Sequence, residues 1–224
     1  MDTTNEQRLP NCLSLKRLSL EGAAPAKGSE LVATPGGGAS TSYPNFFQEQ
    51  QHTHWCWAAV STALGNYYQS QTWSTFTQLQ LYCAMFGLTP SQCTGTRYTD
   101  SLCNRDYQLI PPMQYVGVFR KGVIGTPSRN ALRIELVNDR PFAVHLNPNT
   151  GADEGHFVVI SAYSPGTSGN SLALWYVCDP WAAGLMRWVV CDTFPERYPG
   201  DPNSTWDYTY YTAKGAPNPA SRGG

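Results

Sequence analysis

The chain has 224 residues, enough for one sizeable hydrophobic core, while two full domains would be cramped. Charged residues make up 14% and aromatic residues 12% of the sequence, and glycine and proline are frequent, which predicts a turn-rich globular protein with many packed rings. The net charge of -1 and the lack of any Lys or Arg run argue against nucleic-acid binding. No apolar stretch approaches the ~20 residues of a membrane span, so no membrane insertion is expected.

Composition divides the chain into a leader, a folded domain and a tail. Residues 1–42 lack apolar periodicity and are expected to form a flexible leader, and residues 214–224 a flexible tail, which leaves a domain over 43–213. Residues 1–20 lack the basic-then-apolar pattern of a secretory signal peptide. Such a leader fits delivery by a specialised secretion system without a Sec signal, or removal by self-cleavage. The alternative is an ordinary disordered terminus of a cytoplasmic protein.

Helices are expected in the first part of this domain. Apolar and small residues recur at near-helical spacing over 56–68, which predicts a buried helix with Cys56 in its first turn. A second helix is expected to begin at Thr75, whose capping-box partner is Gln78, and to end at Gly87.

A third helix is expected with Thr126 as N-cap and Pro127 in its first position, ending at Asn138. The stretch 88–107 between the second and third helices is rich in turn residues and is predicted to be an irregular loop. After the third helix, short segments rich in β-branched and aromatic residues predict antiparallel strands. Helices followed by a sheet are typical of an α+β domain. The expected strands are 142–146, 156–163, 172–179 and 186–190.

Cys56 is the candidate nucleophile. It opens a helix, where the positive end of the helix dipole and the N–H groups of the first turn favour a thiolate. Gln50 precedes it by six residues and can donate a hydrogen bond to an oxyanion, together with the backbone N–H of Cys56. The neighbouring Gln51 is an alternative donor. A plain core cysteine beside Trp57 is the competing interpretation.

His156 and Asp179 are the candidate partners of this thiol. His156 opens an apolar strand after Gly155, and an imidazole there can take the thiol proton and later protonate the leaving group. Asp179 ends the following strand, so in a hairpin its carboxylate would lie beside His156 and fix the tautomer of the ring. His145 is a rival base, but it alternates with apolar residues and is expected to face the other way.

These motifs together resemble those of papain-like cysteine peptidases, most closely the compact bacterial branch that includes plant-pathogen effector proteases and relatives of double-glycine leader peptidases. The resemblance implies a papain-like fold with N-terminal helices packed on a C-terminal antiparallel sheet. It assigns the roles of nucleophile, general base, orienting acid and oxyanion donor to Cys56, His156, Asp179 and Gln50. Papain itself has Asn rather than Asp in the third role. The motifs are Gln50-x5-Cys56-Trp57-Ala58-Ala59, Gly155-His156-Phe157-Val158-Val159 and Asp179-Pro180-Trp181.

The leading hypothesis is a cysteine peptidase that works through a Cys-His-Asp triad and a thioester acyl-enzyme. Its partners would be a protein or peptide substrate and, for a secreted effector or toxin, an inhibitor or immunity protein; no cofactor is expected. Acyl transfer to an amine, or deamidation, would use the same machinery. The third hypothesis is a non-catalytic binding or metal-holding module, which is favoured only if Cys56 is locked in a disulfide.

Two histidines near Cys56 suggest a competing metal site. His52, His54 and Cys56 form an HxHxC pattern, but three donors within five residues seldom close a tetrahedral site, and no fourth ligand is evident. In a peptidase the two histidines would line the entrance of the cleft.

The chain has seven cysteines, an odd number that leaves one thiol over if the rest pair. The favoured disulfide is Cys93–Cys103, because both lie in the turn-rich loop that most needs a cross-link. Cys83 can replace either partner, and Cys178–Cys191 is another candidate pair. Cys178 lies in an apolar strand and is expected to be a buried free thiol. A fully reduced chain is the alternative, as in a cytosolic protein.

Overall fold

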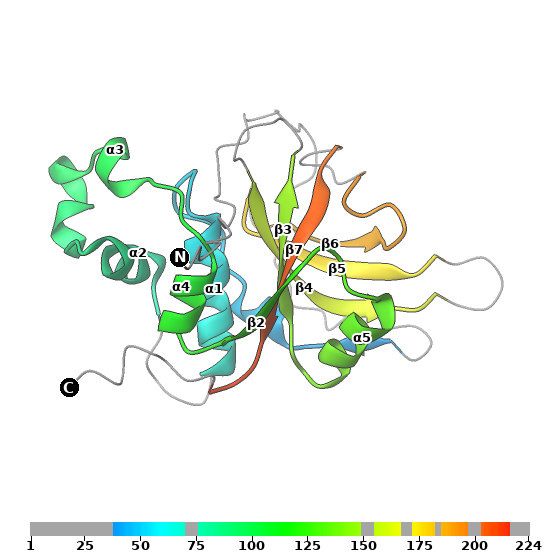
Figure 1. The fold of residues 1–224 in the computed structure, drawn as a ribbon. Helices are drawn as coiled ribbons and strands as arrows, with labels where there is room; N and C mark the ends of the chain where they lie inside the picture. Colours follow the sequence, from blue (N-terminus) through cyan, green and yellow to red (C-terminus); the bar gives the residue numbers. More distant parts are fainter. Residues whose placement is uncertain are drawn as a thin grey trace, which may run out of the picture.

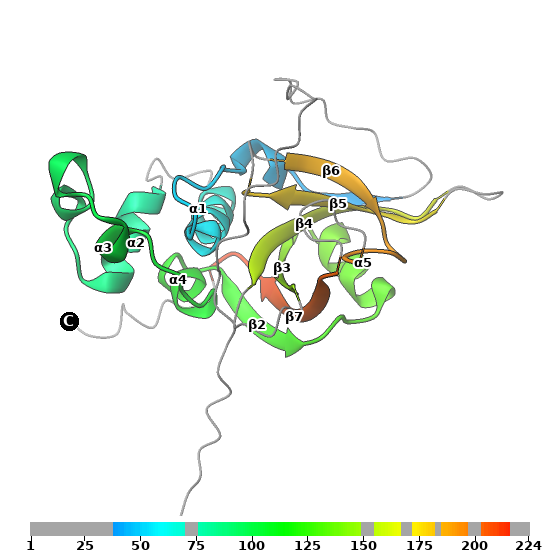
Figure 2. The ribbon, with the colours of Figure 1, turned by 90° about the horizontal axis from the view of Figure 1, so that it is seen from above.

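The computed structural model of this chain describes residues 38–69, 76–148, 155–166, 172–181, 185–196 and 203–215. An antiparallel sheet has helices α1 to α4 on one side and α5 on the other (Figure 1). Seen from above, the sheet curves round α5 (Figure 2). The predicted α+β class is confirmed, although two strands, Ala39–Ser40 and Phe119–Ile124, come before the last helix in the chain. The helices are α1 (Cys56–Tyr68), α2 (Gln78–Phe86), α3 (Asp100–Cys103), α4 (Ile110–Tyr115) and α5 (Arg129–Val137).

The second helix begins later than predicted. Its N-cap is Thr77, which forms a capping box with Gln80, whereas the predicted cap Thr75 lies outside the described residues. The sequence holds two overlapping capping-box patterns, and burial decides between them. Gln78, the partner expected for Thr75, is buried and binds the chain ahead of α1 instead. The predicted end at Gly87 is right, because this residue has the left-handed φ of 65° that favours glycine.

The cap of α5 also differs from the prediction. Ser128 is the N-cap and accepts a hydrogen bond from the N–H of Ala131. The predicted cap, Thr126, donates instead to the carbonyl of Trp206, and Pro127 therefore precedes the helix. The predicted irregular loop 88–107 contains α3 and two short 3-10 turns, η2 (Pro90–Gln92) and η3 (Gly95–Arg97).

The sheet has the strand order β2-β7-β3-β4-β5-β6, and β1 pairs with β4 outside this path. Neighbouring strands are antiparallel, as predicted. Three strands were not predicted: β1, β2 and β7. Of these, β7 lies between β2 and β3. The strands are β1 (Ala39–Ser40), β2 (Phe119–Ile124), β3 (Phe142–Asn147), β4 (His156–Ser164), β5 (Leu174–Asp179), β6 (Leu185–Val190) and β7 (Thr205–Thr212).

Both faces of the central strands are buried. Along β4, Phe157 and Val159 pack into the core shared with α1, whereas Val158 and Ile160 pack into the core shared with α5. This alternation places successive side chains on opposite faces. A strand that is covered on both faces has a nearly continuous apolar sequence, which explains the composition of β4.

The predicted leader is described only at its end. Residues 1–37 lie outside the described residues, as do residues 216–224 of the predicted tail. Ala39 and Ser40 pair with Tyr163 and Ala162 as strand β1, and Thr41 is buried. The described part of the fold therefore includes residues ahead of Tyr43, where the domain was expected to start. None of the described helices is long and apolar enough to cross a membrane.

Candidate active site

Cys56 is the first residue of α1 and is fully buried. The N-cap position is occupied by Trp55, whose side chain caps no helix N–H group and instead stacks on Tyr82 with ring centroids 4.6 Å apart. The positive end of the α1 dipole is therefore not neutralised by a capping side chain, which favours negative charge at Cys56.

The sulfur of Cys56 is engaged in a disulfide. The thiol expected at this position is thus oxidised in this state. Burial raises the pKa of Cys178 and of Cys191 to about 12, so both thiols stay protonated at neutral pH. Cys178 is a buried free thiol, as predicted. The structure also joins Cys93 to Cys103, the favoured pair, and leaves Cys83, Cys178 and Cys191 free.

His156 and Asp179 form a buried pair. The Nε2 atom of His156 lies 2.5 Å from Oδ1 of Asp179, and each residue is only 5–6% exposed. The contact arises because β4 begins at His156 and the neighbouring antiparallel strand β5 ends at Asp179, so the hairpin expected from the sequence is confirmed. The N–H of Trp181 donates to the same carboxylate oxygen at 2.8 Å, which holds the carboxylate in place.

Gln50 connects this pair to the chain that leads into α1. Its backbone N–H donates to the carbonyl of Pro180, the residue after Asp179, at 2.9 Å. Its side-chain Nε2 donates to the carbonyls of His52 and Thr53 at 2.9 and 2.8 Å. In this geometry the amide N–H groups brace their own loop, and Oε1 is buried with no hydrogen-bond partner among the described residues.

The alternative donor, Gln51, has an exposed side chain. Its backbone N–H donates to Oε1 of Gln78 at 3.0 Å, while Nε2 of Gln78 donates to the carbonyl of Glu49 at 2.7 Å. Gln78 therefore fixes the loop on both sides of Gln50. The sequence predicts Gln78 only as a capping-box partner, because no local pattern shows that a helical glutamine reaches back to an earlier loop.

Cys56 lies in the same hydrophobic core as the residues next to His156 and Asp179. Phe157, which follows His156, and Cys178, which precedes Asp179, belong with Cys56 to the buried cluster between α1 and the sheet. The structure thus brings His156 and Asp179 into contact, ties Gln50 to the end of β5, and packs the start of α1 against the same strands.

His145 lies on the opposite face of the sheet from His156. The strand register pairs His145 with Phe157 and Leu146 with His156, and adjacent positions on a strand face opposite ways. His145 shares its face of the sheet with Phe157, whose ring lies 5.1 Å away and packs in the same core as Cys56, so the expectation that His145 faces away from the site is not supported. Nδ1 of His145 is 2.6 Å from Oδ1 of Asp207 on β7. Asp207 was not predicted from the sequence, although the aromatic and β-branched residues around it are typical of a strand.

The histidines of the HxHxC pattern have separate partners. Nδ1 of His54 lies 2.7 Å from Oδ1 of Asp106, and Nδ1 of His52 lies 3.1 Å from the hydroxyl of Tyr98, on which its ring stacks. Within the described part of the chain, no three or more His, Cys, Asp or Glu residues are arranged to hold a metal ion. The arrangement gives the metal hypothesis no support.

The sequence model of the Peptidase_C39 like family matches residues 40–211, which is well over half of the chain. A comparison with curated proteins found no match.

Proposed function

Because the chain belongs to the Peptidase_C39 like family of cysteine peptidases, we propose that it hydrolyses peptide bonds with Cys56 as nucleophile, His156 as general base and Asp179 as orienting acid. The observation that carries this proposal is the buried His156–Asp179 pair, 2.5 Å apart, linked through Gln50 to the chain entering α1. A peptidase acts on a protein or peptide substrate.

The proposed chemistry follows from the tautomer of the imidazole. With Nε2–H donating to Asp179, Nδ1 of His156 is the basic nitrogen and takes the proton of the Cys56 thiol. The thiolate attacks the carbonyl carbon, and the tetrahedral intermediate collapses when the amine leaves with the proton from His156. Water, deprotonated by His156, then cleaves the thioester, releases the acid and restores the thiol.

Two donors are proposed for the oxyanion of the tetrahedral intermediate. The backbone N–H of Cys56 belongs to the first turn of α1, where N–H groups are not used within the helix. The amide of Gln50 is the second donor. For this role it must exchange one of its bonds to the carbonyls of His52 and Thr53 for a bond to the oxyanion.

The oxidised state of Cys56 adds a requirement and favours a second candidate function. A thiol reductant must first release Cys56, since only the thiolate is nucleophilic. A chain in which this disulfide is permanent is a non-catalytic module with a peptidase fold. Acyl transfer to an amine, or deamidation, would need the same released thiolate and differs only in the acceptor or the leaving group.

The test compares reduced wild type, unreduced wild type and reduced Cys56→Ala on a peptide library, with Cys191→Ala as the matched control. We expect cleavage by reduced wild type and by the control, and none by Cys56→Ala. An active Cys56→Ala chain would refute the mechanism. Inactivity of a fully reduced, folded wild type would favour the non-catalytic module. Adding a primary amine to the reaction separates hydrolysis from acyl transfer, because transfer yields an amide and hydrolysis an acid.

The resemblance to effector proteases supports a role as an effector or toxin that is exported without a Sec signal. An inhibitor or immunity protein would then protect the producing cell. Fractionation of a culture of the producing cells, followed by detection of the chain in the medium or in a target cell, tests this role. Retention in the producer cytoplasm under all conditions would contradict it.

A further inference from the structure

The two tryptophans that flank Cys56 are both held by one short stretch of chain. This stretch, residues 102–106, comprises the end of α3 and the turn after it, and we call it the cradle. The carbonyl of Cys103 accepts a hydrogen bond from the indole N–H of Trp55 at 3.0 Å. The carbonyl of Arg105 accepts one from the indole N–H of Trp57 at 3.1 Å. The residue before the proposed nucleophile and the residue after it are therefore fixed by the same element.

The side chains of the cradle hold the two residues further upstream. Oδ1 of Asn104 accepts a hydrogen bond from the backbone N–H of His54 at 2.9 Å, and its Nδ2 donates to the hydroxyl of Thr53 at 2.8 Å. Oδ1 of Asp106 lies 2.7 Å from Nδ1 of His54. The chain that enters α1 is thus bound through backbone, hydroxyl, imidazole and indole groups at successive positions, so it cannot shift without breaking several hydrogen bonds.

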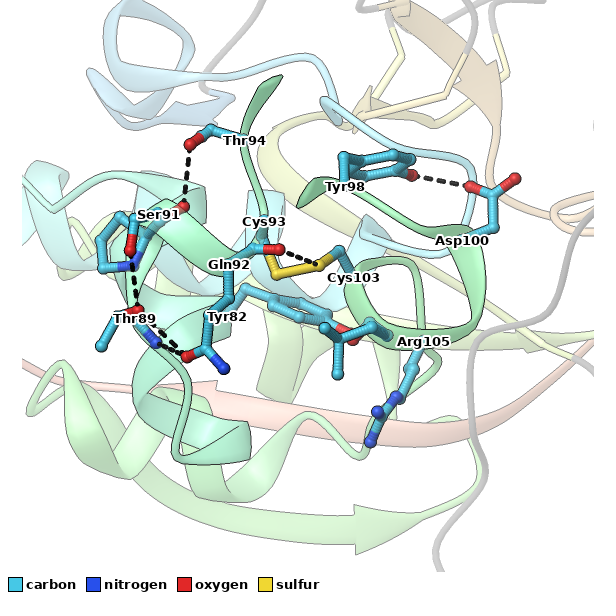
Figure 3. The surroundings of a disulfide bond; sticks show 12 residues. Tyr82, Thr89, Ser91, Gln92, Cys93, Thr94, Tyr98, Asp100, Cys103 and Arg105 are labelled. Atoms are coloured by element: carbon cyan, nitrogen blue, oxygen red, sulfur yellow. Dashed lines mark hydrogen bonds between the residues drawn. A yellow bond between two sulfur atoms is a disulfide. The ribbon is translucent and has the colours of Figure 1, made fainter. Parts of the chain in front are cut away.

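The Cys93–Cys103 disulfide anchors the cradle through Cys103 (Figure 3). Both cysteines are buried, with 3% and 0% exposure. Next to it, the hydroxyl of Tyr82 on α2 donates to the carbonyl of Leu102 at 2.7 Å. Helix α3 has only four residues and is too short to be stable by itself. The disulfide and Tyr82 therefore supply the rigidity that the local backbone lacks.

We propose that the cradle, closed by the Cys93–Cys103 disulfide, positions Cys56 for attack, a role that rests on the proposed function. Its members are positioning residues, because they act through Trp55, Trp57 and His54 and not on the substrate. Both the sulfur and the backbone N–H of Cys56 depend on where the first turn of α1 lies. A misplacement of about 1 Å can lower a rate by about 100-fold. The Cys93–Cys103 disulfide must therefore stay intact while the disulfide of Cys56 is reduced.

The test is the double variant Cys93→Ala/Cys103→Ala, with Cys191→Ala as a control that removes a thiol elsewhere. Each protein is reduced to release Cys56, and mass spectrometry records which cysteines are free. Three properties are then measured: kcat and KM on a cleaved peptide, the pH dependence of Cys56 alkylation by iodoacetamide, and urea unfolding. We expect the double variant to lose about tenfold or more in kcat with KM little changed, and its alkylation profile to move to higher pH. The control should match wild type.

An unchanged kcat and an unchanged alkylation profile, with only the unfolding free energy lowered, would show that the disulfide is merely structural and would overturn the proposal. If the double variant fails to fold, Asn104→Ala takes its place, since it keeps the disulfide but removes the bonds to His54 and Thr53; the same two readouts decide. If reduced wild type cleaves no peptide, the alkylation profile alone tests the cradle, so failure of the proposed function is recognised separately.

Discussion

Replacing Gly155 by alanine should damage the fold next to His156, because the added methyl group would overlap a buried ring. A Cβ at this position would lie 1.7 Å from Nε2 of His145 and 2.4 Å from its Cε1. Ordinary van der Waals contacts of a Cβ begin at 3.4 Å, twice the 1.7 Å found here. The imidazole ring would therefore have to move away by about half of that contact distance. His145 is fully buried and has no open space to retreat into without moving its neighbours.

The retreat would break the 2.6 Å contact between Nδ1 of His145 and the carboxylate of Asp207. Losing a hydrogen bond to a charged group costs about 1.5–3 kcal/mol, and overpacking a core costs about 1–3 kcal/mol. The two costs are alternatives in part, since the ring either moves or stays compressed. We therefore expect Gly155→Ala to lower the free energy of unfolding by about 2–4 kcal/mol.

Urea unfolding followed by circular dichroism measures this cost, and a double-mutant cycle with His145→Ala assigns it. In the His145→Ala background the methyl group enters space vacated by the ring, so adding Gly155→Ala should cost less than about 1 kcal/mol. Gly65→Ala is a useful comparison, because its Cβ would lie 2.9 Å from the side chain of Phe76 and alanine is favoured within a helix. Equal costs of Gly155→Ala in the two backgrounds would refute the overlap with His145.

Asp179→Ala should lower kcat less than His156→Ala, because the base survives the loss of the group that orients it; equal loss in kcat measurements on one peptide would contradict an orienting role. Unreduced protein should show neither turnover nor alkylation of Cys56, and peptide mapping should reveal the partner of its disulfide; rapid labelling before reduction would contradict the oxidised state. Burial raises the pKa of Cys178 from 9.0 to about 12, so its neutral form contributes stability below pH 9 that is lost as the pH rises toward 12. The urea midpoint should fall over this range in wild type and less so in Cys178→Ala, and identical profiles of the two proteins would contradict this.

The parts of the candidate site that lie close together along the chain could be predicted from the sequence. Helical spacing places Cys56 at the start of a helix, because side chains three and four residues apart share a face. His156 and Asp179 meet because they belong to consecutive strands, and a hairpin needs only a turn between them. Cys93 and Cys103 are only 10 residues apart in one loop, so their pairing could also be predicted from the sequence.

The contacts between distant segments were decided by the tertiary structure alone. Asp207 reaches His145 because β7 lies between β2 and β3 in the sheet. Gln78 is buried against the loop ahead of α1 and forms hydrogen bonds with that loop. The cradle likewise meets the tryptophans beside Cys56 across nearly fifty residues of chain. Such contacts use carbonyls, indoles and amides that occur throughout any sequence. Only packing selects which of them meet, because a polar group that is buried must find a partner wherever the fold provides one.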